Sequence, residues 1–158
     1  PYSMKKKTDL VILSLGLAVA HLLLVFGRNR VPAEIADTYG GFLEAFSSGE
    51  YEDIDPYLHY ENPEYRQMNL ENFHNIQSYQ IQSWKKLNDQ LWVAKASVQL
   101  VGDTDWTQCY HFVGWLDGRI QIMLGPQNVP SELADGLDLS GFVPPNALPP
   151  DTEIIPLS

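Results

Sequence analysis

The chain contains only one cysteine, Cys109, among its 158 residues. A lone cysteine cannot close a disulfide within the chain, and it supplies no Cys-x-x-Cys pair for zinc or redox chemistry. The sequence therefore predicts neither a disulfide-stabilised scaffold nor a cysteine-based zinc site. Since about 100 to 200 residues form one domain, a multidomain enzyme is also excluded.

Basic residues are scarce after the first thirty positions. From Val31 onward, five Lys and Arg stand against nineteen Asp and Glu, which gives a net charge of −14. A surface of this charge repels phosphate backbones, whereas a nucleic-acid-binding protein needs a stripe of Lys and Arg that displaces counterions. We therefore expect no nucleic-acid partner.

Formal charge is missing from the eighteen residues that run from Leu10 to Gly27. As a helix that rises about 1.5 Å per residue, this stretch would be about 27 Å long, close to the hydrocarbon thickness of a bilayer. Three lysines at positions 5–7 precede it, and Arg28 and Arg30 follow it. Because positive charge favours the inside, we predict a single transmembrane helix with residues 1–9 in the cytoplasm and the rest outside.

A cleaved signal peptide is the alternative for the same stretch. Ala18-Val19-Ala20 resembles the small-residue site at which such peptides are cut. The apolar run continues through residues 22–26, beyond that site. We interpret the stretch as an anchor because a signal peptide would not need these additional apolar residues.

Residues from Pro32 to Phe46 follow a helical period. Proline is suited to the first turn, and apolar residues then recur about every 3.6 positions. They are Ile35, Tyr39, Phe42, Leu43 and Phe46. Ser47-Ser48-Gly49 predicts the end of this helix. We expect a shorter helical stretch over residues 50–58, made irregular by Pro56, and one more helix over residues 70–75.

From Ser78 the period of the apolar residues changes to two, which indicates strands. We expect four, over residues 79–87, 91–101, 106–116 and 119–124. The dipeptides Asn88-Asp89 and Asp117-Gly118 predict tight hairpin turns, so the strands should form an antiparallel meander. The second strand should bury one face and expose the other to solvent. The third strand is apolar on both faces and should therefore be central in the sheet.

Helices followed by strands predict an α+β fold, in which two or three helices pack on a curved antiparallel sheet of about four strands. We assign this domain to residues 31–141. Five of the eleven prolines then lie in residues 142–158. This composition predicts an extended or disordered tail.

Two sequence segments carry a resemblance to a known protein family. One is Phe-Leu-Glu-Ala-Phe-Ser-Ser-Gly-Glu-Tyr at 42–51, and the other is His-Phe-Val-Gly-Trp-Leu-Asp-Gly-Arg-Ile at 111–120. With them, residues 33–140 resemble the nuclear-transport-factor-2-like superfamily, and in particular its small bacterial membrane-anchored members. The resemblance implies a cone whose sheet wraps a long helix, displayed outside the cytoplasm from a bacterial cell membrane. Related folds serve as channel components, isomerases, dehydratases or cyclases, so the fold does not specify an activity.

Two groups of residues could carry chemistry. His111 and Cys109 share a strand face, where a thiolate–imidazole pair is conceivable, but Val113 beside them favours a packed core or interface. Tyr57 and His59 lie in an acidic stretch that lacks a recognised metal-ligand spacing, which favours a solvated loop over a metal site.

Aromatic residues are too numerous to be buried completely in a domain of this size. We therefore expect a pocket or an interface that draws on seven candidates. They are Tyr39, Tyr57, His59, Trp92, Tyr110, His111 and Trp115. The polar residues from Gln77 to Gln90 suit an edge strand, which either is protected by them or pairs with another chain.

These features predict a membrane-anchored, extracytoplasmic binding or assembly module without catalytic activity, cofactor or metal. Its expected partners are the membrane, through Leu10 to Gly27, and a protein or a second copy of the chain. Two alternatives are a small lyase or isomerase and a subunit of a conjugation or secretion channel. A cavity that holds a His or a carboxylate with a strongly shifted pKa would favour the enzyme.

Overall fold

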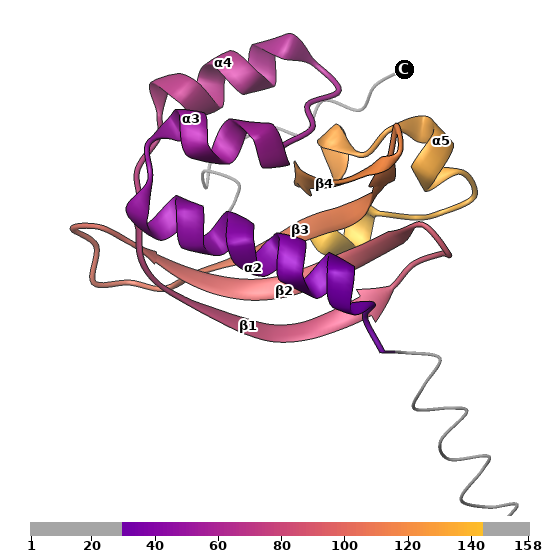
Figure 1. Cartoon of the computed structure of the whole chain (residues 1–158), viewed down its shortest axis with the longest axis horizontal. Coiled ribbons are helices and arrows are strands. Elements are labelled where there is room, and N and C mark those ends of the chain that lie inside the picture. Colours follow the sequence, from indigo (N-terminus) through magenta and orange to yellow (C-terminus); the bar gives the residue numbers. More distant parts are fainter. Residues whose placement is uncertain (1–29, 144–158) are drawn as a thin grey trace, which may run out of the picture. The chain divides into compact units, whose positions relative to one another are not determined.

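The computed structural model describes residues 30–143 (Figure 1). The predicted cytoplasmic segment, the predicted membrane span and residues 144–158 lie outside the described residues. Among residues 30–143, no helix has both the length and the apolar character needed to cross a membrane.

Four antiparallel strands form one sheet in the order of the sequence. They are β1 (Ile76–Lys86), β2 (Leu91–Leu100), β3 (Thr107–Leu116) and β4 (Arg119–Leu124). The predicted α+β fold and the predicted meander are therefore confirmed. β3 pairs with both β2 and β4, as expected from the apolar residues on both of its faces.

Helix α2 (Ala33–Ser48) packs against one face of this sheet, as Figure 1 shows. The predicted stripe is buried at Ile35, Tyr39, Phe42 and Leu43, whereas Phe46 is partly buried. The sheet contributes Trp92, Ala94, Val98, Val113 and Ile122 to the same core. Each large apolar side chain in such a core stabilises the fold by about 1.5 to 3 kcal/mol relative to exposure.

The opposite face of the sheet is covered by the chain that follows β4. Three short elements lie there, η2 (Pro126–Asn128), α5 (Ser131–Ala134) and η3 (Ser140–Phe142). Leu91 and Val93 of β2 are buried in this second cluster. The sequence predicts that this face of β2 is the more solvent-exposed one. That prediction is wrong at these two residues, because a segment distant in sequence folds over them.

Phe142 belongs to the folded domain rather than to the predicted tail. Its ring lies 5.7 Å from that of Tyr110 and 5.6 Å from that of Phe112, measured between centroids, in edge-on arrangements. The ammonium of Lys85 lies 5.3 Å from the centre of the Phe142 ring. The domain therefore extends at least one residue beyond the predicted boundary at 141.

The connection between α2 and the sheet contains α3 (Tyr51–Ile54), η1 (Asp55–Tyr57) and α4 (Pro63–Glu71). The irregular helix predicted over residues 50–58 matches the first two elements. The helix predicted over residues 70–75 is wrong, because α4 begins seven residues earlier and ends at Glu71. Asn62 caps this helix by accepting the Glu64 N–H at 2.9 Å, a start signal that the sequence contained.

The predicted strand and turn boundaries differ from the observed ones where neighbours decide them. β1 begins at Ile76 rather than residue 79, because Ile76 is buried opposite Leu100. β3 begins at Thr107, which leaves Trp106 48% exposed. The predicted turn at Asn88-Asp89 is wrong, because the N–H groups of Leu87 and Asn88 both donate to the Leu91 carbonyl across a longer loop.

Candidate functional site

Tyr39 and His111 form a buried polar pair between α2 and β3. The Tyr39 hydroxyl lies 2.9 Å from Nδ1 of His111. The His111 side chain also lies edge-on to the ring of Phe42, with 5.8 Å between the centroids. Burial lowers the pKa of His111 to about 4 and raises that of Tyr39 above its usual range. Both groups are therefore neutral near pH 7.

Cys109 does not form a thiolate–imidazole pair with His111. Its thiol donates to the Ala96 carbonyl, with 3.5 Å between sulfur and oxygen. Burial raises the pKa of Cys109 to about 12, so the thiol stays protonated at neutral pH. A protonated, half-buried thiol is a poor nucleophile. The alternative of a packed core position therefore describes this strand face better.

Three other candidates pack in the core beneath α2. Trp92 is 5% exposed, and its indole N–H has no hydrogen-bond partner among the described residues. Tyr57 and Trp115 are partly buried and pack against the same cluster. The ring of Tyr57 lies 6.2 Å from that of Phe42. These residues fill the space between helix and sheet rather than lining an open site.

Tyr110 lies on the opposite face of β3, where its hydroxyl accepts a hydrogen bond from Gln108 at 3.0 Å. A cavity of about 260 Å³ lies beside β3, just beyond the C-terminal end of β4. Its lining consists of Cys109, Tyr110, His111, Leu124, Gly125, Pro126, Gln127, Phe142 and Val143. Tyr110 and His111 thus both line this cavity, although His111 is only 7% exposed and offers it little surface.

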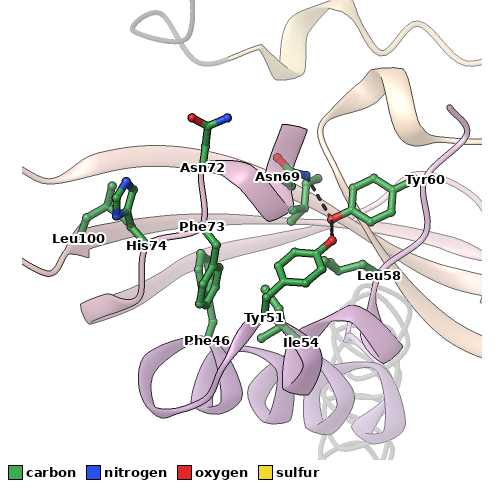
Figure 2. Close-up of a pocket in the computed structure, with 11 residues that line it drawn as sticks. Phe46, Tyr51, Ile54, Leu58, Tyr60, Asn69, Asn72, Phe73, His74 and Leu100 are labelled. Carbon is green, nitrogen blue, oxygen red and sulfur yellow. Dashed lines mark hydrogen bonds between the residues drawn. The ribbon is translucent and has the colours of Figure 1, made fainter. Parts of the chain in front are cut away.

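A second cavity, which we call the aromatic pocket, has a volume of about 140 Å³ and is lined by residues of both α3 and α4 (Figure 2). It is lined by Phe46, Tyr51, Ile54, Leu58, Tyr60, Asn69, Asn72, Phe73, His74, Leu100 and Leu124. The rings of Phe46 and Phe73 stack with 5.9 Å between their centroids. The apolar side chains among these residues make the pocket predominantly hydrophobic.

One wall of the aromatic pocket is polar. Figure 2 shows the hydroxyls of Tyr51 and Tyr60 directed toward each other, 3.1 Å apart. Asn69 of α4 donates its amide N–H to the Tyr60 hydroxyl, also at 3.1 Å. Burial and the hydrogen bond with Tyr60 raise the pKa of Tyr51 well above its usual range. This wall therefore offers hydroxyl and amide groups for hydrogen bonding.

A third cavity, the arginine groove, shares Leu58 and Tyr60 with the aromatic pocket. Its volume is about 400 Å³, and it is lined by Asp55, Pro56, Leu58, His59, Tyr60, Pro63, Arg66, Arg119 and Gln121. It lies where the segment after η1 meets β4. There Leu58 pairs with Ile122, and the His59 N–H donates to the Ile122 carbonyl at 2.9 Å.

The two arginines of this groove are held differently. Arg66 donates Nε and Nη2 to the two oxygens of Asp55, at 2.9 and 2.7 Å. These bonds hold the pKa of Asp55 below its usual range. With the amide of Gln121 oriented so that its oxygen faces Arg119, the arrangement that satisfies both side chains, Arg119 donates Nε and Nη2 to this neutral, buried group.

The acidic stretch around His59 is explained by local pairing. Asp53 caps α3 by accepting the Glu50 N–H at 2.8 Å. His59 lies 3.2 Å from a carboxylate oxygen of Glu61, in an exposed pair. Within the described part of the chain, no three His, Cys, Asp or Glu side chains come close enough to hold a metal ion.

No family model matches the chain, nor does any curated protein or solved structure. The resemblance to the nuclear-transport-factor-2-like superfamily therefore stays a prediction.

Sequence reasoning missed the residues that line the two adjoining cavities. Of the seven candidates, only His59 lines either the aromatic pocket or the arginine groove. Tyr51 and Leu58 could have been found, since with Ile54 they recur at helical spacing within residues 50–58, which predicts that they face inward. The sequence contains no pattern that marks Arg119 and Gln121 as site residues. These strand residues line the groove only because another segment crosses the edge of β4.

Proposed function

We propose that the chain is a membrane-anchored binding module whose domain lies outside the cytoplasm and holds an apolar side chain of a protein partner in the aromatic pocket. The observation that carries this proposal is the size and lining of that pocket. A cavity of roughly 150 Å³ with apolar walls holds one benzene molecule. The aromatic pocket, at about 140 Å³, fits a group of the same size.

A protein partner fits this pocket better than a free small molecule does. Sites for drug-sized ligands usually enclose about 300 to 1,000 Å³. Protein interfaces, by contrast, are often anchored by one aromatic or aliphatic side chain in a small pocket. The hydroxyls of Tyr51 and Tyr60 and the amide of Asn69 would orient the partner through hydrogen bonds to its backbone beside such an anchor.

The buried imidazole weighs against the alternative of a small enzyme. His111 does have the strongly shifted pKa that would mark an acid–base group, but the shift is downward to about 4. A catalytic base works best when its pKa lies near the operating pH. At neutral pH His111 is a weak base, and one of its nitrogens is already engaged by Tyr39.

The membrane anchor and the family remain parts of the proposal that rest on the sequence. The apolar stretch from Leu10 to Gly27 and the three lysines before it support an anchor with its N-terminus in the cytoplasm. Helices that pack on a four-stranded antiparallel sheet are compatible with the cone expected from the resemblance.

Photo-crosslinking in intact cells tests the binding role. A benzophenone amino acid at Asn72, which is exposed at the rim of the pocket, should give a discrete adduct with a protein partner. His74→Trp, which crowds the same rim, should remove the adduct. Gln80→Trp adds the same ring to an exposed position on β1 and should leave the adduct unchanged.

An adduct that persists at full yield in the folded His74→Trp variant would contradict this use of the pocket. So would the failure of the Asn72 probe to capture any protein. Circular dichroism of both tryptophan variants establishes that the domain is folded before the adducts are compared.

A further inference from the structure

The arginine groove contains an unusual share of the positive charge of this domain. From Val31 onward the chain has only five Lys and Arg, and Arg66 and Arg119 both line this one groove. In a domain with nineteen acidic residues against those five, two guanidinium groups in one groove are a local exception to the overall charge.

Arg119 differs from Arg66 in the partner that it holds. The Arg66 guanidinium is neutralised by Asp55 through two hydrogen bonds. Arg119 is exposed and donates to the amide oxygen of Gln121, which carries no charge. Since a guanidinium has five N–H donors, Arg119 keeps donors for another acceptor in the groove.

Gln121 is a positioning residue for this guanidinium. Its side chain is 3% exposed, so its amide oxygen is fixed within the fold. Arg119 lies two residues earlier on β4 and on the same face of the sheet. With the Gln121 oxygen facing Arg119, the two hydrogen bonds from Nε and Nη2 hold a flexible side chain across the edge of β4, at the groove.

We propose that Arg119 binds a carboxylate of the same partner whose apolar side chain enters the aromatic pocket, so that the recognised segment combines an apolar and an acidic residue. This inference rests on the proposed binding function. Leu58 and Tyr60 line both cavities, so adjacent residues of one extended peptide can reach both. A carboxylate is a stronger acceptor for guanidinium than a neutral amide oxygen is.

The test uses three synthetic peptides and the full-length chain in lipid nanodiscs. The peptides are acetyl-Gly-Phe-Asp-Gly-amide, its Asn analogue with no carboxylate, and its Ala analogue with no aromatic ring. Dissociation constants come from chemical-shift titrations. We expect the Asp peptide to bind about 3- to 10-fold more tightly than the Asn peptide, the range for a partly exposed, charge-assisted pair.

Variants locate the source of that preference. Arg119→Gln should bring the ratio of the two dissociation constants close to one, and Arg119→Lys should retain part of it. Lys95→Gln removes one positive charge from β2, outside the groove, and should leave the ratio unchanged. Thermal unfolding of each variant shows that the fold is retained.

The two proposals fail in different ways. If the Asp and Asn peptides bind equally well but more tightly than the Ala peptide, the carboxylate site is overturned and the aromatic pocket stands. If the Asp preference survives in Arg119→Gln, the assignment to Arg119 is overturned. If the Ala peptide binds as tightly as the others, or if none binds, the binding function is overturned together with this inference.

Discussion

At the scale of single residues, His111 shows how burial turns a chemical candidate into a structural one. An imidazole on a strand beside a cysteine suggests catalysis when only the residue types are considered. In the fold, the same ring lies against Phe42 and Tyr39, and removal from water disfavours its charged form. Its pKa of about 4 therefore reflects packing.

This depressed pKa predicts how stability depends on pH. The unfolded chain protonates His111 below about pH 6.5, whereas the folded chain does so only below about pH 4. The unfolded state thus binds more protons between these values, and the free energy of unfolding should fall as the pH is lowered from 6.5 to 4. A shift of this size corresponds to a loss on the order of 3 kcal/mol.

Urea denaturation at several pH values measures this effect. His111→Gln, which cannot titrate, should lose most of the slope between pH 6.5 and 4, whatever its stability at pH 7. The salt-bridged Asp55 does not confound this window, because its pKa is lowered from 3.8 and its contribution is lost only at lower pH. An unchanged slope in the variant would show that His111 is not the group responsible.

At the scale of elements, local sequence signals predicted the structure best where the interacting residues are neighbours in the sequence. The Asp117-Gly118 turn is an example, since both residues have positive φ, 52° and 76°. Positive φ at both central residues is what a two-residue type I′ hairpin requires. The loop from Leu87 to Gln90 shows the opposite case. There Asn88 donates to the Leu133 carbonyl of a distant segment at 2.9 Å, and the expected tight turn does not form.

Gly118→Ala tests the turn between β3 and β4. A side chain at φ 76° is strained even though no atom lies close to the position of the added Cβ. We expect the substitution to lower the free energy of unfolding by about 1 kcal/mol. Asp117→Gly is the matched change at the neighbouring position, and it should be neutral or slightly stabilising because glycine accepts positive φ. Equal losses in both variants would contradict a conformational origin.

At the scale of the whole molecule, the edge of the sheet at β1 bears on association with other chains. Tyr79 and Ile81 are 42% and 38% exposed on this strand. The strand also has two irregularities in its pairing with β2 and ends in Lys85 and Lys86. Bulges and lysines discourage pairing between edges, so the features of β1 favour protection over pairing with a second chain.

The predicted orientation in the membrane can be measured with the single cysteine removed. In a Cys109→Ser background, Asp103→Cys introduces a thiol in the exposed loop between β2 and β3. A membrane-impermeant maleimide should label it in intact cells, because we predict that the domain lies outside the cytoplasm. Lys6→Cys should react only after lysis, and the reverse pattern would contradict the predicted topology.

The sequence by itself determined the kinds of elements and much of their order. The 3.6-residue stripe from Ile35 to Phe46 specifies a helix with one buried face, and the change to a period of two from Ser78 specifies strands. These patterns are sufficient because each is a property of neighbouring residues. They therefore predicted the α+β fold and the meander.

Only the tertiary structure decided where the cavities lie and which side chains meet in them. The arginine groove exists because residues 55–66 cross the edge of β4, some sixty residues later in the chain, and bring Arg66 near Arg119. The aromatic pocket likewise joins α3, α4 and the ends of two strands. Local periodicity reports which face of an element is buried but not which distant segment covers it, and that packing determined the site.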